Sequence, residues 1–389
     1  MTYSSKIQSL SESATIAIST LAKELKAQGK DVLSFSAGEP DFDTPQAIKD
    51  EAIKALNEGF TKYTPVAGIT ELLKAIADKL KRENNLDYEP NEILVSNGAK
   101  QSLFNAIQAL VEEGDEVIIP VPFWVTYPEL VKYSGGVSKF IQTDEKNHFK
   151  ITPKQLQDAL SPKTKMLILT TPSNPTGMLY SKAELEALSE VLKDTKVWVL
   201  SDEIYEKLVY NGSFVSCASI NEDMKKRTIT INGLSKSVAM TGWRIGYAAS
   251  KDKKLIKLMN NLQSQCTSNI NSITQKASIV ALNGMVDKEI EVMRIAFQKR
   301  CDLAHAQINA IEGLQVLKPD GAFYLFINIG NLCKGDSMRF CHELLEKEGV
   351  ALVPGKAFGL EGYVRLSFAC SEEQIKQGIE RLARFVKNL

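Results

Sequence analysis

Short apolar runs alternate with helical patterns through the middle of this 389-residue chain. Each run is predicted to be a strand, followed by a small polar motif and then a helix. Each strand and the polar motif after it fall within residues 92–100, 116–124, 166–177 and 197–205, and two further strands are expected at 228–231 and within 243–249. Strands that are apolar on both faces, with helices between them, are typical of a mostly parallel sheet covered on both sides. The pattern therefore predicts an α/β fold.

Amphipathic patterns predict the helices, at about 46–58, 69–84, 97–112, 126–134 and 181–193. From about 252 a long helical stretch runs to 305 and leads into a smaller α+β unit. The strands of that unit are expected within 321–327 and 362–368, and an amphipathic helix at 371–388 ends the chain. Because no repeat or Pro/Ser-rich linker interrupts the sequence, we expect two domains that share one continuous long helix.

The N-terminal part is polar and is predicted to form a helix that ends near Gly29, before a strand that starts at Val32. Ser13 and Thr15 have two interpretations here, as helix caps or as ligand contacts. A turn-rich segment follows the strand, and in it Gly38 allows the backbone to approach another group closely. A later irregular stretch, 61–65, carries Tyr63.

Composition narrows the class of partner. Lys+Arg and Asp+Glu both number 47, so the formal net charge is zero. This balance favours neither a nucleic acid nor an anionic membrane as the partner. No apolar run is long enough to span a bilayer, and the N-terminus lacks the apolar core of a signal peptide. We expect a cytoplasmic protein.

Cysteine and histidine usage argues against a metal site. The six cysteines are scattered, with no Cys-x-x-Cys pair, and the three histidines do not stand at metal-binding spacings. The cysteines are expected to be reduced thiols rather than a zinc site or a disulfide framework. We therefore expect no protein-bound metal and no catalysis based on histidine.

The segment 232–247 carries the most distinctive chemistry. It places Lys236 among small and hydroxyl residues, directly after a β-branched strand, with Arg244 eight positions later. A partly desolvated lysine with a lowered pKa forms Schiff bases with aldehydes, and an arginine binds phosphate. Pyridoxal 5'-phosphate carries both groups. Taken alone, Lys236 is better described as an ordinary loop lysine, so the case for a cofactor depends on the rest of the chain.

Other strand ends carry further candidates. Asp202 ends a buried strand, where a carboxylate is costly unless it is paired. It is either a helix N-cap or the partner of a pyridine nitrogen. Tyr205 lies on the same side as Asp202 if the segment is helical, where its phenol would meet the 3-oxygen of the ring. Asn174, within Asn-Pro-Thr-Gly, is most simply a turn residue.

The strand-to-helix junction at 97–100 offers a phosphate site, because the N-terminus of a helix presents free N–H groups and a positive dipole, although Gly98 alone is weak evidence. Trp124 at another strand end either packs in the core or stacks on a planar cofactor. Arg244 and Arg365 are both expected in apolar strands, where each guanidinium needs an anion. Structural salt bridges are the alternative for both arginines.

Eight short motifs occur in a fixed order along the chain. They are Ala-Gly-Glu-Pro-Asp-Phe-Asp-Thr-Pro (37–45), Tyr-Thr-Pro (63–65), Pro-Phe-Trp (122–124), Asn-Pro-Thr-Gly (174–177), Ser-Asp-Glu-Ile-Tyr (201–205), Ser-Lys (235–236), Met-Thr-Gly-Trp-Arg-Ile-Gly-Tyr (240–247) and Val-Arg-Leu-Ser (364–367). Together they resemble the pyridoxal-phosphate-dependent aminotransferases of fold type I, class I/II, and most closely the bacterial aspartate aminotransferase branch. The resemblance covers essentially the whole chain.

This resemblance implies a fold with three parts. A large cofactor-binding domain, 46–285, would contain a mostly parallel seven-stranded sheet flanked by helices. A smaller α+β domain would span 286–389, and the N-terminal segment 1–45 would pack with it. The family also implies a homodimer with active sites at the interface between the subunits.

The resemblance also assigns roles to residues of this chain. Lys236 would carry the cofactor as a Schiff base, Asp202 would pair with the ring nitrogen, Tyr205 and Asn174 would bind the 3-oxygen, and Trp124 would stack on the ring. The phosphate would be held by Gly98, Ala99, Ser235 and Arg244, and by Tyr63 from a second subunit. The substrate α-carboxylate would pair with Arg365, in a pocket completed by Gly38, Trp124 and Asn174.

The distal carboxylate of an acidic substrate lacks one expected partner. Other aspartate enzymes use an arginine from the second subunit, and the corresponding region here, 260–269, contains none. In this branch of the family the task passes to Lys100, with Ser13 and Thr15.

The expected reaction is transfer of the amino group from L-aspartate to 2-oxoglutarate by a ping-pong mechanism. Lys236 would act as the general base on the α-carbon proton. One alternative is a transaminase for prephenate, aromatic or alanine-type substrates on the same scaffold. Another is a ligand-sensing regulator built on an aminotransferase-like domain, although no basic helix-turn-helix is evident in the sequence.

Overall fold

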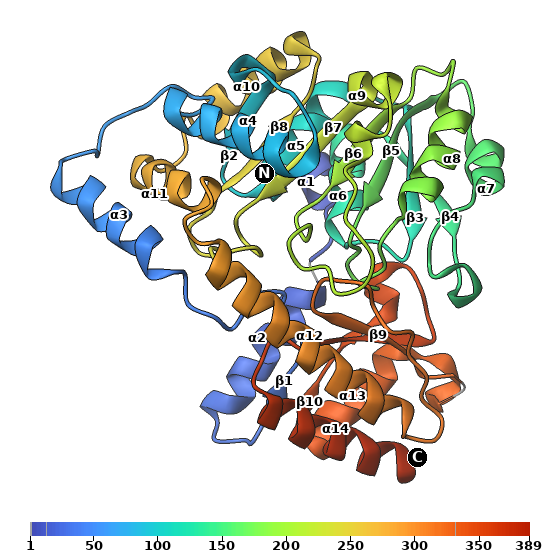
Figure 1. Cartoon of the computed structure of the whole chain (residues 1–389). Helices are drawn as coiled ribbons and strands as arrows, with labels where there is room; N and C mark the ends of the chain where they lie inside the picture. Colours follow the sequence, from blue (N-terminus) through green and yellow to red (C-terminus); the bar gives the residue numbers. More distant parts are fainter. Residues whose placement is uncertain (1, 13, 331) are drawn as a thin grey trace.

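Figure 1 shows a computed structural model of the chain, which describes residues 2–12, 14–330 and 332–389. A seven-stranded sheet dominates it, with the strand order β2-β8-β7-β6-β5-β3-β4. The strands are β2 (Ile93–Ser96), β3 (Glu116–Val121), β4 (Val137–Gln142), β5 (Thr164–Thr170), β6 (Trp198–Asp202), β7 (Thr228–Gly233) and β8 (Gly246–Ala249). All neighbouring pairs are parallel except the two that involve β8, which is antiparallel to both β7 and β2. The predicted α/β fold with a mostly parallel seven-stranded sheet is confirmed.

Helices cover both faces of this sheet, as the apolar pattern requires. In β3, Ile118 packs in one core, while its neighbours Val117 and Ile119 pack in another on the opposite face. The core that contains Ile119 includes side chains from α5 (Ala99–Leu110), α6 (Thr126–Ser134) and α10 (Lys253–Cys266). The other side is covered by α4 (Thr70–Asn84), α7 (Pro153–Ala159), α8 (Lys182–Leu192) and α11 (Ser272–Leu282). Successive strand residues thus face opposite layers.

A second, smaller unit lies below the large sheet in Figure 1. Its antiparallel sheet has the order β11-β12-β9, and the short strand β1 pairs in parallel with β10. The strands are β1 (Leu33–Ser34), β9 (Tyr324–Asn328), β10 (Val350–Ala351), β11 (Val353–Pro354) and β12 (Tyr363–Ser367). The helices α2 (Ala14–Ala27), α13 (Ser337–Glu348) and α14 (Glu372–Lys387) belong to this unit. Residues from the N-terminal strand therefore pack with the C-terminal part of the chain.

Three further helices are α1 (Ser5–Gln8), α3 (Gln46–Asn57) and α9 (Glu222–Arg227). The α3 helix packs against α11 at one end of the molecule. Among the described residues, no helix has both the length and the apolar composition needed to cross a membrane.

The predicted helical stretch from 252 to 305 is wrong as a single element. It consists of α10, α11 and α12 (Asp287–Asn309). The first break follows Thr267, where Ser268 has a left-handed φ of 59° and the Asn271 side chain caps α11 by accepting from the N–H of Thr274. The second lies at Gly284, which has a φ of 89°. The α12 helix alone is the continuous helix that runs between the two units (Figure 1). The boundaries at 45 and 285 stay a prediction.

Candidate active site

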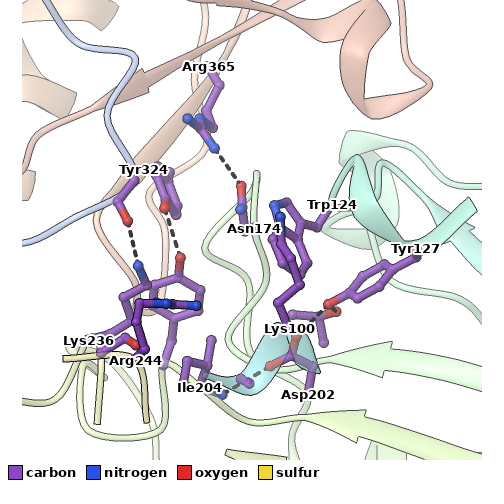
Figure 2. A pocket seen from close by; sticks show the side chains of 15 residues that line it. Lys100, Trp124, Tyr127, Asn174, Asp202, Ile204, Lys236, Arg244, Tyr324 and Arg365 are labelled. Atoms are coloured by element: carbon purple, nitrogen blue, oxygen red, sulfur yellow. Dashed lines mark hydrogen bonds between the residues drawn. The ribbon is translucent and has the colours of Figure 1, made fainter. Parts of the chain in front are cut away.

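The strand ends of the large sheet meet at one cavity of about 300 Å³. Ligands of open parallel sheets bind at the carboxyl ends of the strands. Because β8 is reversed, the residues that precede it lie at this same edge. The cavity is lined by Gly38, Ala99, Lys100, Trp124, Tyr127, Thr170, Asn174, Asp202, Ile204, Tyr205, Ser235, Lys236, Arg244, Tyr324 and Arg365. Most of the residues singled out from the sequence are among them (Figure 2).

Lys236 lies in the turn that follows β7, with its side chain pointing into the cavity. Its amine donates a hydrogen bond to the carbonyl oxygen of Gly38 at 2.6 Å. Burial is the largest influence on this amine and lowers its pKa to about 8, although the nearby carboxylate of Glu39 acts in the opposite direction. A lysine with a pKa this low has a much larger unprotonated fraction near neutral pH than an ordinary lysine, so it can act as a nucleophile and as a base.

Asp202 is the last residue of β6, and only 3% of it is exposed. Its Oδ2 accepts a hydrogen bond from the hydroxyl of Tyr127 at 2.8 Å, and its Oδ1 accepts one from the N–H of Ile204 at 3.3 Å. Burial raises the pKa of Asp202 to about 6, while these two bonds and the charge of Lys236 oppose the rise. The predicted alternative as a helix N-cap is wrong, because residues 204–207 form turns rather than a helix.

The structure also corrects the setting of Arg244. The sequence predicts this arginine inside a strand, but β8 begins only at Gly246, and Arg244 lies in the preceding turn with a left-handed φ of 55°. Its guanidinium donates to the carbonyl oxygens of Thr241 at 2.8 Å and Asn97 at 3.3 Å. The turn replaces the strand because Arg244 folds back toward the junction between β2 and α5, where these carbonyls lie.

Gly98 and Ala99 lie beside this guanidinium. Gly98 has a φ of 83°, which favours glycine, and a Cβ atom there would stand 2.3 Å from Nη2 of Arg244, so a side chain would also displace this guanidinium. Gly98 is also the N-cap of α5, and no side chain caps this helix end. The N–H of Gly98 donates to the carbonyl oxygen of Ser96 at 2.7 Å, so the free N–H groups are those of the first turn of α5, which begins at Ala99. Together with the arginine they form a site suited to phosphate.

Arg365 lies in β12 of the small unit, and 2% of it is exposed. It donates to Oδ1 of Asn174 at 2.9 Å and to the carbonyl oxygen of Ser36 at 2.8 Å, while its Nε has no partner among the described residues. Its charge lies 4.4 Å from the ring centre of Tyr324. No carboxylate neutralises this buried guanidinium, so the structural salt bridge considered from the sequence is absent from the described contacts.

Two tyrosines of the cavity were not identified from the sequence. Tyr127 bonds to Asp202, and its ring meets that of Trp124 edge-on with centres 5.5 Å apart. Tyr324 shares a hydrogen bond of 2.8 Å with the hydroxyl of Tyr205. The three-residue spacing of Trp124 and Tyr127 was a usable signal, because residues i and i+3 share one side of a helical turn. Tyr324 had no comparable signal, because its partners are distant in sequence.

Three predicted residues lie elsewhere or cannot be placed. Tyr63 is 92% exposed and does not line the cavity of its own chain. Ser13 lies outside the described residues, and Thr15 lies in α2 with a side chain that is likewise outside the description.

Positively charged side chains outnumber negatively charged ones in the lining of the cavity. Four cationic side chains line it, Lys100, Lys236, Arg244 and Arg365, against the single carboxylate of Asp202. Trp124 supplies an aromatic face, and the amine of Lys100 lies 4.9 Å from its ring centre. This donor set and the glycine at 98 fit a planar cofactor that carries a phosphate and an aldehyde, together with an anionic substrate. Among the described residues, no group of three or more potential ligands could hold a metal ion.

Comparisons with known proteins agree with this chemistry. A sequence model of the family described as "Aminotransferase class I and II" matches residues 30–382. The chain is 47% identical to an aspartate aminotransferase of Bacillus subtilis (strain 168), with 100% of this chain and 99% of the relative covered. It is 45% identical to an aspartate/prephenate aminotransferase of Nitrosomonas europaea, with 98% and 99% covered. The solved aspartate aminotransferase from Thermus thermophilus with maleate superposes with a TM-score of 0.95 at 42% identity, covering 99% of each chain.

Proposed function

Because this chain belongs to the class I and II aminotransferases, and is therefore a pyridoxal-phosphate-dependent transaminase, we propose that it moves the amino group of L-aspartate to 2-oxoglutarate, giving oxaloacetate and L-glutamate. The family predicted from the motifs is confirmed. The observation that carries the substrate proposal is the excess of cationic side chains in the cavity. The cofactor engages two of them, Arg244 through its phosphate and Lys236 through its aldehyde, so Arg365 and Lys100 remain for a substrate with two carboxylates.

We assign the cofactor to the following residues. When bound, pyridoxal 5'-phosphate supplies an aldehyde that binds amines and a ring that withdraws electrons. Lys236 makes the covalent attachment, Asp202 keeps a proton on the ring nitrogen, Tyr205 and Asn174 bind the 3-oxygen, and Trp124 covers one face. Gly98, Ala99, Ser235 and Arg244 hold the phosphate. These roles are supported by the position of most of these side chains around a single cavity.

The substrate roles follow from charge and position. Arg365 orients the α-carboxylate, because its planar fork is buried and carries no competing anion, and Asn174, Gly38 and Trp124 complete this pocket. The freed amine of Lys236 then takes the proton from the substrate α-carbon and returns it later in the same half-reaction. Two such half-reactions, run in opposite directions, give ping-pong kinetics.

Lys100 is proposed to bind the distal carboxylate, with Ser13 and Thr15 of the N-terminal segment. Desolvation and the positive charge of Arg244 both lower the pKa of Lys100. An incoming carboxylate would relieve that repulsion, which supports an anionic ligand next to this lysine.

A homodimer is part of the proposal, since Tyr63 reaches the phosphate only from a second copy of the chain. Tyr63 is 92% exposed, and two neighbouring apolar residues of α3, Ile53 and Leu56, are more than half exposed. Large apolar side chains that are exposed in a single chain suit a protein interface. A cytoplasmic location stays a prediction.

Prephenate is a second candidate acceptor, favoured by the relative that is named an aspartate/prephenate aminotransferase. The regulator alternative is not supported, since the relatives compared above are named as enzymes.

A steady-state comparison of substrates tests the proposal. Purified holoenzyme is assayed with aspartate and with alanine as donors to 2-oxoglutarate, and with prephenate as acceptor from aspartate. We expect kcat/KM for aspartate to exceed that for alanine at least tenfold, a difference of about 1.4 kcal/mol. Equal values for aspartate and alanine would overturn the acidic-substrate assignment but leave the transaminase intact.

A further inference from the structure

Tyr127 lies in the wall of the cavity, next to Asp202. It stands in the first turn of α6, and 2% of it is exposed. Its hydroxyl lies 2.8 Å from Oδ2 of Asp202 and 2.7 Å from Oγ1 of Thr170 (Figure 2). These three residues come from α6, β6 and β5, so the contact joins elements that are distant in sequence. No motif that identifies the family includes Tyr127.

The direction of these hydrogen bonds follows from the groups themselves. An ionised carboxylate only accepts, so the single hydroxyl proton of Tyr127 is donated to Asp202. The Tyr127 oxygen then accepts from the hydroxyl of Thr170. Both hydroxyl protons are thus donated in the direction of the carboxylate, from Thr170 to Tyr127 and from Tyr127 to Asp202. The remaining donor to Asp202 is the N–H of Ile204.

The ring of Tyr127 makes a separate contact. It meets the ring of Trp124 edge-on, at an interplanar angle of 86°. Such an arrangement restricts how the Trp124 ring can tilt. The side chain of Tyr127 thus contacts both the carboxylate of Asp202 and the ring of Trp124.

We propose that Tyr127 is a positioning residue that holds the Asp202 carboxylate in its ionised form and fixes the plane of Trp124. This inference rests on the proposed role of Asp202 toward the cofactor ring. Tyr127 touches neither substrate nor cofactor in this assignment and acts only through these two neighbours.

The inference predicts a shift in pH dependence. The charged and titratable groups that face Asp202 are Tyr127, Lys236 and Tyr205, and burial opposes the ionised carboxylate. Because the Tyr127 hydrogen bond lowers the pKa of Asp202, the variant Tyr127→Phe should raise it. As the pH falls, a carboxyl with a raised pKa becomes neutral at a higher pH. The variant should therefore begin to lose its cofactor at a higher pH than the wild type does. A hydrogen bond to a charged group corresponds to a shift of about one to two pH units.

The experiment measures cofactor dissociation from holoenzyme by absorbance, across a range of about pH 5 to 9. The wild type is compared with Tyr127→Phe, Thr170→Val and Asp202→Asn. Thr170→Val should give a smaller shift in the same direction, because it weakens the bond to Asp202 only indirectly. Tyr180→Phe is the matched control: Tyr180 is also a buried tyrosine, and its hydroxyl accepts a bond from the N–H of Ile151 outside the cavity.

Each outcome decides a separate point. An upward shift in Tyr127→Phe that is absent from Tyr180→Phe supports the inference. An unchanged profile in Tyr127→Phe, when Asp202→Asn does alter retention, overturns it. If Asp202→Asn leaves retention unchanged, the assignment of Asp202 itself fails, and this inference fails with it. Should Tyr127→Phe not fold, an unchanged profile in Thr170→Val overturns the proposal.

Discussion

The two ends of the cavity are built in different ways. The proposed cofactor end takes Asp202, Lys236 and Arg244 from neighbouring strand ends of the seven-stranded sheet. The proposed substrate end combines Arg365 from the small unit with Lys100 from α5. At the first end the buried carboxylate already has its hydrogen bonds, whereas at the second no carboxylate of the described residues pairs with the guanidinium of Arg365 or the amine of Lys100.

This difference has a physical consequence. Hydrogen-bonded strands hold their ends at fixed spacings, so the relative positions of Lys236 and Asp202 are set by the same sheet. Groups contributed by separate units have no such common frame, and their spacing depends on how the units pack. Substitutions at the substrate end should therefore weaken substrate binding, selectively at Lys100 and for all amino donors at Arg365, while substitutions at the cofactor end should stop the reaction itself.

The largest effect is expected for Lys236→Ala. Loss of the general base alone lowers kcat by about 10²–10⁴-fold. The loss should be similar for every amino donor, because the amine acts at the α-carbon that all donors share. The measurements are steady-state rates with aspartate and alanine and the absorbance of the bound cofactor.

Lys150→Ala is the control for this variant. Lys150 is also a largely buried lysine, but it pairs with Glu184 outside the cavity, so its loss should leave kcat near the wild-type value. Wild-type turnover in Lys236→Ala would refute the covalent role of this lysine.

Arg365→Lys is expected to have the next largest effect. The substitution keeps the charge but removes the planar fork, and a buried group is left incompletely paired. We expect a loss of about 2–5 kcal/mol in transition-state binding, seen in kcat/KM for every α-amino acid. Cofactor absorbance should be unchanged. Arg227→Lys, at an arginine paired with Asp223 on α9, is the control, and an equal loss there would point to a general effect on folding.

The sequence allowed more of the cofactor end than of the substrate end to be predicted. Strand ends follow from apolar runs, so Asp202 and Lys236 were found from local patterns. Arg244 was placed wrongly in a strand, because its left-handed turn depends on carbonyls of another segment. Tyr324 was missed because its two partners, Tyr205 and Arg365, are both more than 40 positions away in the sequence. No local pattern encodes such contacts.

Lys100→Met should have a smaller and more selective effect. Methionine keeps much of the apolar stem but removes the ammonium group. We expect kcat/KM for aspartate to fall by an amount equivalent to about 1.5–3 kcal/mol, which is the contribution of a hydrogen bond to a charged group. The kcat/KM for alanine should stay almost unchanged. Lys100→Arg keeps the charge and should preserve most of the preference. If both donors lose equally, Lys100 does not bind the distal carboxylate.

The smallest effect is expected at Tyr324, which contacts both ends of the cavity. Its hydroxyl bonds to Tyr205, and its ring lies against the guanidinium of Arg365. Tyr324→Phe removes only the hydroxyl. It should raise the activation barrier by about 0.5–1.5 kcal/mol, which lowers kcat, and it should leave KM for aspartate unchanged. Tyr324→Leu also removes the ring and should raise KM as well.

These two variants separate the hydroxyl from the ring, and a change in KM is the signal that distinguishes them. The division between the ends assigns the hydroxyl to the cofactor end and the ring to the substrate end. A raised KM with unchanged kcat in Tyr324→Phe would place the hydroxyl at the substrate end instead. The boundary between the two ends would then separate Tyr205 from Tyr324. It would cross the 2.8 Å hydrogen bond that joins their hydroxyls rather than divide Tyr324 itself.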